Sequence, residues 1–302
     1  MHRIFIVSAI ALIIGVACST GAAEVKTFEK KFQVGAGGML ALATESGSVT
    51  VTAGSGSEVV VSARIEGRSS DVAKFEIDAT QNGSSVNVTG KAPKDFWRFL
   101  RGHNLDVQFT VTVPRAYNVR LETSGGDITV SGLAGRVEGE TSGGNVSIDH
   151  VEGVAKLGTS GGDIRVDAVK GDVKAETSGG NVKVKNVVGN VDGETSGGNC
   201  VAEDVDGKVR LETSGGNVTI KVRGANKGIH AETSGGNVTI MISKNVGAVI
   251  DAGTSGGEVT CDLPVMVSGK IAEDRVKGTV NGGGEVIYAH TSGGNVQIKP
   301  LD

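Results

Sequence analysis

The sequence predicts an all-β fold, a parallel β-helix (solenoid) built from rungs of about 18 residues. The string Thr-Ser-Gly-Gly occurs nine times between Thr123 and Gly294, and its first six copies start 18 residues apart. Glycine accounts for 48 of the 302 residues, whereas aromatic residues make up only 3%. Self-similarity at a short fixed period is typical of a solenoid, in which each rung buries its apolar face against its neighbours. Thin repeated layers of Val and Ile form such a core without aromatic side chains.

The chain begins with the pattern of a secretory signal peptide, which we predict to span residues 1–23. Arg3 precedes an apolar run over residues 4–17, which is too short for an ordinary membrane span, and small residues follow it. We therefore expect an exported protein, located in the periplasm, at the outer membrane or outside the cell. Cys18 follows Gly-Val-Ala, which resembles a lipobox. Acylation of Cys18 and cleavage after Ala23 are therefore two alternative fates of the N-terminus.

We predict that residues 24–302 form a single β-helix domain with three parts. Residues 24–113 form an N-terminal cap and irregular rungs, because apolar runs bounded by Gly or Ser recur there without a fixed period. Residues 127–216 form five regular rungs. Residues 217–302 form irregular C-terminal rungs, and the last copy of the string, which starts at Thr291, is expected to end the stack.

Each regular rung repeats one internal pattern. Position 1 is Asp or Asn, positions 2 and 4 are apolar, position 9 is Gly, and positions 15–18 are Thr-Ser-Gly-Gly. Apolar residues two positions apart lie on one face of a strand, so each rung is predicted to contain two strands joined by two glycine corners. The apolar positions do not follow a six-residue period, and we therefore predict a right-handed coil rather than the left-handed hexapeptide type.

Position 1 of successive rungs carries side-chain amides and carboxylates. We interpret them as a ladder that hydrogen-bonds from rung to rung and caps the turn, and a cation or glycan site is the alternative. The asparagines of this ladder are Asn145, Asn181, Asn199, Asn217 and Asn237. Position 14 repeats glutamate, for which a solvated edge and a stripe that binds divalent ions or a cationic partner are the two interpretations. These glutamates are Glu122, Glu140, Glu176, Glu194 and Glu212.

Residues 91–101 differ from the rest of the chain, because they contain the single Trp, two Phe and four basic residues. One interpretation is a short helical insertion that packs these rings against the solenoid. The other is a loop that touches a membrane surface or a partner, since exposed aromatic rings beside Lys and Arg suit an interface. In that case Phe96, Trp97 and Phe99 are the partner contacts.

Cys200 and Cys261 replace apolar residues of the rung pattern, so both are expected to point into the core. They lie about three rungs apart, on the order of 14 Å, and a disulfide requires Cα atoms within about 7 Å. We therefore predict two free buried thiols. The histidines that follow the signal peptide fall at unrelated rung positions, so we expect no catalytic site, no metal site and no cofactor. They are His103, His150, His230 and His290.

Three features of the chain are shared with one known family. They are residues 40–51, the strand from Val111 to Pro114, and the rungs in which Thr-Ser-Gly-Gly is followed by Asn or Asp. Behind a signal peptide, these features resemble the exported β-strand-repeat family usually labelled "putative adhesins". The resemblance covers about residues 26–300. It implies a fold of repeated strands, and it brings no catalytic residues, because the function of that family is unknown.

We therefore expect a non-catalytic exported scaffold of the cell envelope or surface, whose long faces bind a protein, a glycan or a wall component. The formal net charge of −4 gives no basic patch for nucleic acid, and contact with a membrane is expected only through a lipid on Cys18. A polysaccharide-active β-helix enzyme and an envelope-stress accessory protein are the alternatives. An enzyme of this kind would cluster acids in a cleft between long loops, and the irregular segments 64–103 and 262–290 do not concentrate them.

Overall fold

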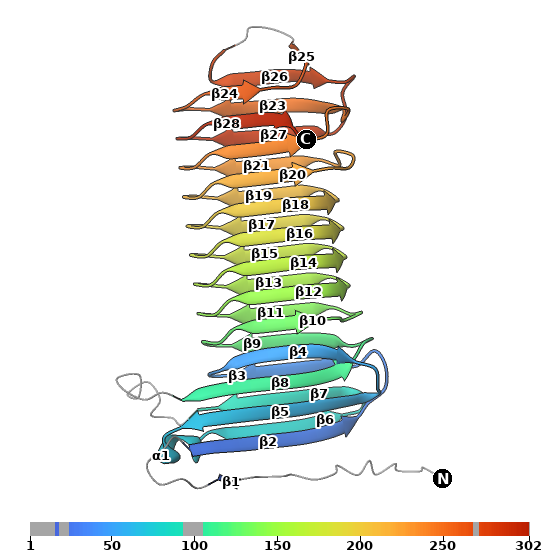
Figure 1. Cartoon of the computed structure of the whole chain (residues 1–302), viewed down its shortest axis with the longest axis vertical. Helices are drawn as coiled ribbons and strands as arrows, with labels where there is room; N and C mark the ends of the chain where they lie inside the picture. Colours follow the sequence, from blue (N-terminus) through green and yellow to red (C-terminus); the bar gives the residue numbers. More distant parts are fainter. Residues whose placement is uncertain (1–15, 18–23, 93–104, 268–271, 302) are drawn as a thin grey trace. The chain divides into compact units, whose positions relative to one another are not determined.

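The computed structural model describes residues 16–17, 24–92, 105–267 and 272–301, and these residues form β-strands almost throughout (Figure 1). The predicted all-β class is confirmed, and the described part of the chain contains a single short helix, α1 (Ser69–Val72). This four-residue helix is far too short to cross a membrane. The chain forms two compact units, residues 1–144 and 145–302.

Several predictions from the sequence concern residues outside the described part of the chain. Of the predicted signal peptide, only β1 (Val16–Ala17) is described, and it pairs antiparallel with β2 (Glu24–Gln33). Cys18 lies outside the described residues, and so do the candidate partner contacts Phe96, Trp97 and Phe99. The assignments made for these residues stay predictions.

The second unit consists of two sheets that each collect one strand from every rung (Figure 1). Sheet A contains, in spatial order, β12 (Val146–Glu152), β14 (Ile164–Lys170), β16 (Val182–Val188), β18 (Cys200–Asp206), β20 (Val218–Val222), β22 (Val238–Ile242), β28 (Val296–Pro300) and β24 (Val259–Cys261). Sheet B contains β13 (Ala155–Thr159), β15 (Val173–Thr177), β17 (Val191–Thr195), β19 (Val209–Thr213), β21 (Ile229–Thr233), β27 (Val286–Thr291), β23 (Ala248–Thr254), β26 (Arg275–Val280) and β25 (Val265–Val267).

The register within the second unit follows the 18-residue period of the sequence. Ile164 lies opposite Val182, and Val182 lies opposite Cys200, in parallel strands of sheet A. The side chains of Ile164, Val182 and Cys200 are fully buried. In sheet B, Val173 and Ala175 are at most 2% exposed. The two predicted strands of each regular rung are therefore present, and the core consists of the expected thin apolar layers. The handedness of the coil stays a prediction.

The corners of the rungs are built in two different ways. Gly171, at position 9, has φ of 151°, and a Cβ atom there would lie 2.2 Å from the carbonyl oxygen of Gly153, so glycine is required. A second bend, at position 6 within the sheet A strands, is made instead by residues other than glycine with φ between 52° and 55°. The two predicted glycine corners are present, and this bend at position 6 was not predicted. The residues concerned are His150, Ala168, Asn186 and Asp204.

The last copy of the repeat string does not end the stack, which corrects the prediction from chain order. Strand β28 lies between β22 and β24, because Val296 is opposite both Val238 and Val259. In sheet B, β27 lies in the same way between β21 and β23. The rung that contains the C-terminal strands is therefore inserted between two rungs that precede it in the sequence.

Hydrogen bonds at the repeat corners follow the same inserted order. The hydroxyl of Thr291 donates to the carbonyl oxygen of Gly236 at 2.7 Å, and that of Thr254 donates to the carbonyl oxygen of Gly294 at 2.7 Å. The chain direction reverses between β25 and β26, and β26 pairs antiparallel with both β25 and β23 at this end of sheet B. The irregular C-terminal rungs predicted from the sequence thus include antiparallel strands.

The predicted separation of the two cysteines changes with this order. Strands β20, β22 and β28 lie between Cys200 on β18 and Cys261 on β24, so four strand spacings separate the cysteines rather than three. Both thiols are free, as predicted. Cys200 is fully buried, and burial raises the pKa of its thiol to about 12. Cys261 is only half-buried, contrary to prediction, because β24 is the outermost strand of sheet A.

The first unit combines parallel rungs with antiparallel strands. One sheet contains β2, β5 (Glu58–Gly67), β8 (Asp106–Pro114), β4 (Ser48–Gly54) and β10 (Ile128–Ser131), and the other contains β6 (Glu76–Asn82), β7 (Ser85–Lys91), β3 (Met39–Thr44), β9 (Asn118–Thr123) and β11 (Val137–Thr141). Strand β5 is antiparallel to both β2 and β8, and β6 is antiparallel to β7. The aromatic residues Phe75, Phe109 and Tyr117 are buried in this unit, so the irregular N-terminal part has a core of a different kind.

Candidate functional site

The asparagines at position 1 are engaged in hydrogen bonds along the stack. The backbone N–H of Asn199 donates to Oδ1 of Asn181 at 2.9 Å, and the side-chain amide of Asn199 donates to the same oxygen at 3.2 Å. The same backbone contact links Asn217 to Asn199 and Asn237 to Asn217, at 2.8 Å each. Asn145 accepts a bond from the backbone N–H of the next rung at 2.9 Å. Because the side-chain oxygens of these asparagines hold adjacent rungs together, we assign them a structural role.

A different group of side chains gathers on the outer face of sheet B. We call it the histidine cluster, and it consists of Glu212, His230, Glu232, Asp251, Tyr288 and His290. The register places His230 opposite Tyr288 and Tyr288 opposite Asp251, while Glu232 lies opposite both Glu212 and His290. Insertion of β27 between β21 and β23 creates this proximity. The two histidines, which the sequence places at unrelated positions, are therefore neighbours in space.

Three rings of the cluster form a continuous stack. The rings of His230 and Tyr288 are 4.6 Å apart and inclined by 6°, and those of Tyr288 and His290 are 4.2 Å apart and inclined by 23°. Partial burial, together with the nearby carboxylates of Glu232 and Asp251, raises the pKa of Tyr288. The stack fixes the orientation of both imidazole rings on a rigid sheet.

Asp251 closes one end of the cluster. Its Oδ2 lies 2.8 Å from Nζ of Lys277, and its Oδ1 lies 3.3 Å from Nε2 of His290. Partial burial favours the protonated carboxyl, but the contacts with Lys277 and His290 outweigh it and hold the pKa of Asp251 below its usual value. This carboxylate is therefore committed to an ion pair.

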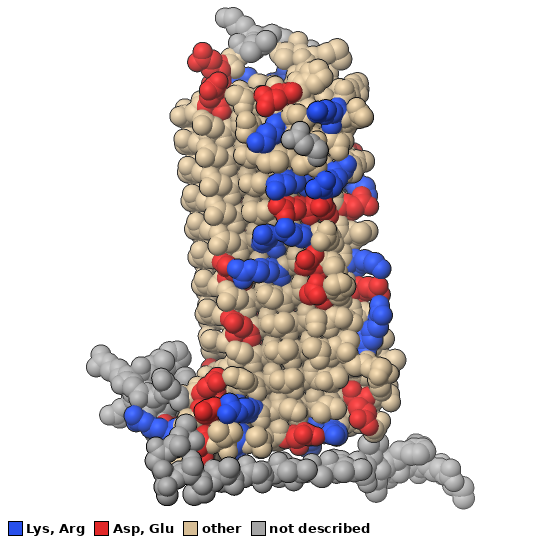
Figure 2. All heavy atoms as spheres, viewed as in Figure 1, with Lys and Arg blue, Asp and Glu red and all other residues tan. Residues whose placement is uncertain are grey.

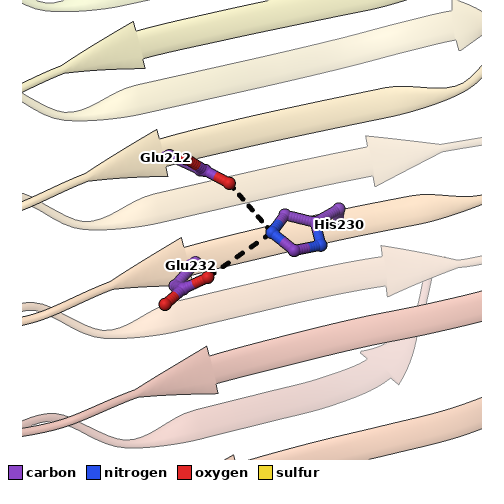
Figure 3. A group of neighbouring side chains, drawn as sticks. All are labelled: Glu212, His230 and Glu232. Carbon is purple, nitrogen blue, oxygen red and sulfur yellow. Dashed lines mark ion pairs between the residues drawn. The ribbon is translucent and has the colours of Figure 1, made fainter.

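Glu212, His230 and Glu232 form the other end of the cluster (Figure 3). Nε2 of His230 lies 2.9 Å from Oε1 of Glu212 and 3.5 Å from Oε2 of Glu232. Arg210 contacts the other oxygen of Glu212, with Nη2 at 2.6 Å, and also contacts Asp192. One imidazole nitrogen thus faces two carboxylates from adjacent strands.

Charged side chains also form contacts on the outer face of sheet A. Figure 2 shows basic and acidic groups beside one another on the second unit. Glu203 lies between Lys185 and Lys221, and its carboxylate contacts both ammonium groups. Hydrogen bonds from Lys185 and Lys221 lower the pKa of Glu203 to about 2. Since its side chain is only 19% exposed, this carboxylate contributes to stability as an ion.

We expect Glu203→Gln to lower the free energy of unfolding by about 1–2 kcal/mol at pH 7. The folded-state pKa of Glu203 lies below the ordinary value of 4.5, so its contribution is present above pH 5 and is lost as the pH falls towards about 2. Urea unfolding at pH 7 and at pH 3 measures the difference between wild type and variant, which should shrink at pH 3. Glu176→Gln, in a half-exposed pair with Lys174, is the control and should change little. A Glu203→Gln deficit that is the same at both pH values would contradict the ionic role.

Most of the chain matches a known protein family. Residues 39–299 match the family model described as Toastrack DUF4097. The chain belongs to the Toastrack DUF4097 family. This membership confirms the resemblance to a family of repeated β-strands that the sequence indicates.

Solved structures similar to this Toastrack chain are distant in sequence. A putative adhesin from Bacteroides fragilis NCTC 9343 shares 13% identity, with 91% of this chain and 97% of that chain covered and a TM-score of 0.41. A putative adhesin from Parabacteroides merdae ATCC 43184 shares 11%, with 94% and 98% covered and a TM-score of 0.43. A putative lipid binding protein from Parabacteroides distasonis ATCC 8503 shares 11%, with 94% and 98% covered and a TM-score of 0.40. No curated protein matches the chain.

The sequence contains one signal for the order of the rungs, on which the histidine cluster depends. Every Thr-Ser-Gly-Gly copy of the second unit is followed by Asn or Asp except the one at Thr254, which is followed by Glu258. Asn295 accepts a hydrogen bond from the backbone N–H of Glu258 at 3.0 Å, so Glu258 occupies the rung beyond Asn295. An outermost rung has no following rung whose N–H needs an acceptor, and glutamate at that position therefore marks the end of the ladder.

Proposed function

We propose that this Toastrack protein is a non-catalytic scaffold of the cell envelope or surface, and that it binds a partner through the outer face of sheet B in the second unit. The partner is a protein, a glycan or a wall component. The observation that carries the proposal is the stack of His230, Tyr288 and His290 beside carboxylates on rigid strands. Rings and charges held in fixed positions lose little conformational entropy when a partner binds.

The charged groups around the stack support binding rather than catalysis. Glu212 is paired with Arg210, and Asp251 is paired with Lys277. A general acid or base needs a pKa near the working pH, whereas the pKa of Asp251 is held low. Such paired groups suit polar contacts at the rim of an interface.

The experiment compares binding of the purified chain to envelope polysaccharide and to solubilised envelope proteins. We expect the double variant Tyr288→Ala/His290→Ala to lose at least tenfold in affinity, while Lys183→Ala on the outer face of sheet A binds as wild type. Equal binding by wild type and the double variant would contradict the assignment of this face. Turnover of a polysaccharide by the purified protein would overturn the non-catalytic role and favour an enzyme.

We also propose that the protein is exported, with either a lipid anchor on Cys18 or cleavage after Ala23 as the fate of its N-terminus. The apolar run over residues 4–17 and the small residues after it support export. The mass of the N-terminal peptide from cell-derived protein distinguishes the two fates. An acylated Cys18 predicts attachment to a membrane, a free Glu24 predicts a soluble exported protein, and an intact Met1 would contradict export.

A further inference from the structure

We propose that Glu212, His230 and Glu232 form a binding site for a divalent transition-metal ion of the zinc class. The candidate ligand atoms, one from each side chain, all lie within 4.8 Å of one another. Zinc bonds of about 2.0–2.2 Å to nitrogen and oxygen place tetrahedral ligand atoms about 3.3 Å apart. The observed separations from Nε2 of His230, 2.9 Å and 3.5 Å, lie on either side of this value.

The two carboxylates need a positive charge between them. Glu212 and Glu232 lie directly opposite each other on the parallel strands β19 and β21, and like charges in such cross-strand pairs repel. Arg210 contacts the Oε2 side of Glu212, so it leaves the oxygen that faces His230 for another partner. A cation held by the imidazole nitrogen and one oxygen of each glutamate removes the repulsion.

Nε2 of His230 has the surroundings of a metal ligand. This atom is shielded from solvent and has no hydrogen-bond partner within the described part of the chain, although Oε1 of Glu212 is only 2.9 Å away. Oε1 of Glu212 is close enough to Nε2 of His230 for an ion pair, but the two atoms do not have the geometry of a hydrogen bond. The oxygen therefore lies to one side of the axis along which the ring nitrogen would donate a proton or bind a metal. Ligand atoms that share one ion have this relation, because the ion itself occupies the axis.

Neighbouring side chains orient two of the three ligands. Arg210 holds one oxygen of Glu212 at 2.6 Å, which turns the other towards His230, and the ring of Tyr288 stacks on the imidazole at 4.6 Å. Supporting contacts of this kind increase metal affinity. One imidazole and two carboxylates suit zinc and, more weakly, manganese or iron(II). Three protein ligands leave a fourth position for water or for a group from a partner.

The experiment titrates Zn²⁺ into the untagged full chain and follows binding by calorimetry. We expect one saturable equivalent, and at least a 100-fold loss of affinity in His230→Gln and in Glu232→Gln. His150→Gln is the matched control, since Nδ1 of His150 lies 2.6 Å from Asp149 and no second carboxylate of the described residues pairs with it. This control should bind Zn²⁺ as wild type does.

Two outcomes would overturn the proposal. One is the absence of saturable binding to the wild-type chain at millimolar Zn²⁺, and the other is unchanged affinity in both His230→Gln and Glu232→Gln. Circular dichroism of each metal-free variant is the test of whether it is folded. Of the three ligands, Glu232 has the most exposed side chain, at 52%, so substitution there should disturb the fold least. Zinc is tested without an envelope partner, so the result is independent of the proposed scaffold role.

Discussion

The variant Gly198→Ala is expected to lose about 3 kcal/mol or more of unfolding free energy, whereas Gly197→Ala should lose less than about 1 kcal/mol. A Cβ atom at Gly198 would lie 2.0 Å from the carbonyl oxygen of Gly180 and 2.4 Å from its carbon, so the backbones of two rungs would have to separate. A Cβ at Gly197 meets no atom closer than 3.5 Å. Urea unfolding followed by circular dichroism at 25 °C measures both losses.

Adjacent glycines of one corner therefore serve as test and control. Neither has a backbone φ in the left-handed region, so the difference between them measures close approach alone. Complete failure of Gly198→Ala to fold, with Gly197→Ala folded, agrees with the expectation. Equal stability of the two variants would contradict the packing of the glycine corners.

Thr195→Val is expected to destabilise the protein by about 1–3 kcal/mol. The hydroxyl of Thr195 donates to the carbonyl oxygen of Gly180 at 2.8 Å and accepts from the backbone N–H of Gly198 at 3.3 Å. The residue is 2% exposed, so water cannot replace the lost partner. Valine has nearly the shape of threonine, and the loss therefore measures the hydrogen bonds rather than a cavity.

Thr195→Ser is the matched control for the hydroxyl. Serine keeps both hydrogen bonds and removes one methyl group, so its cost should be about 1 kcal/mol and smaller than that of valine. Thermal and urea unfolding of the three chains give the order wild type, Ser, Val. A valine variant as stable as wild type would show that the repeated threonine does not hold adjacent rungs together.

The sequence predicts the rungs well because the same physical requirements recur in each one. Position 2 must be apolar to fill the core, Gly198 must lack a Cβ, and Thr195 must carry a hydroxyl, so the pattern is visible without a structure. The N-terminal part was less predictable. Its antiparallel strands and its core of Phe75, Phe109 and Tyr117 do not repeat, and no period reveals them.

The order of the rungs was only partly predictable from the pattern, in which Glu258 marks the end of the ladder. Rungs ending at Thr233, Thr254 and Thr291 share the Thr-Ser-Gly-Gly string and the apolar columns, and β27 pairs in the same register with both β21 and β23. The order in which these rungs stack depends on contacts that do not repeat from rung to rung, such as the antiparallel pairing of β26 with β23. The histidine cluster depends on this choice, and residues 58 or more apart in the sequence, such as His230 and Tyr288, meet only because β27 is inserted.

The inserted order is tested most directly by disulfide crosslinking in a chain whose native residues Cys18, Cys200 and Cys261 are replaced. Thr239 and Gln297 lie opposite each other on adjacent strands, whereas Thr239 and Thr260 are separated by β28. Adjacent parallel strands are about 4.8 Å apart, within disulfide range, and two spacings are not. Under mild oxidation, Thr239→Cys/Gln297→Cys should crosslink in the folded protein and Thr239→Cys/Thr260→Cys should not. Crosslinking of the second pair without the first would contradict the insertion of β28 and, with it, the histidine cluster.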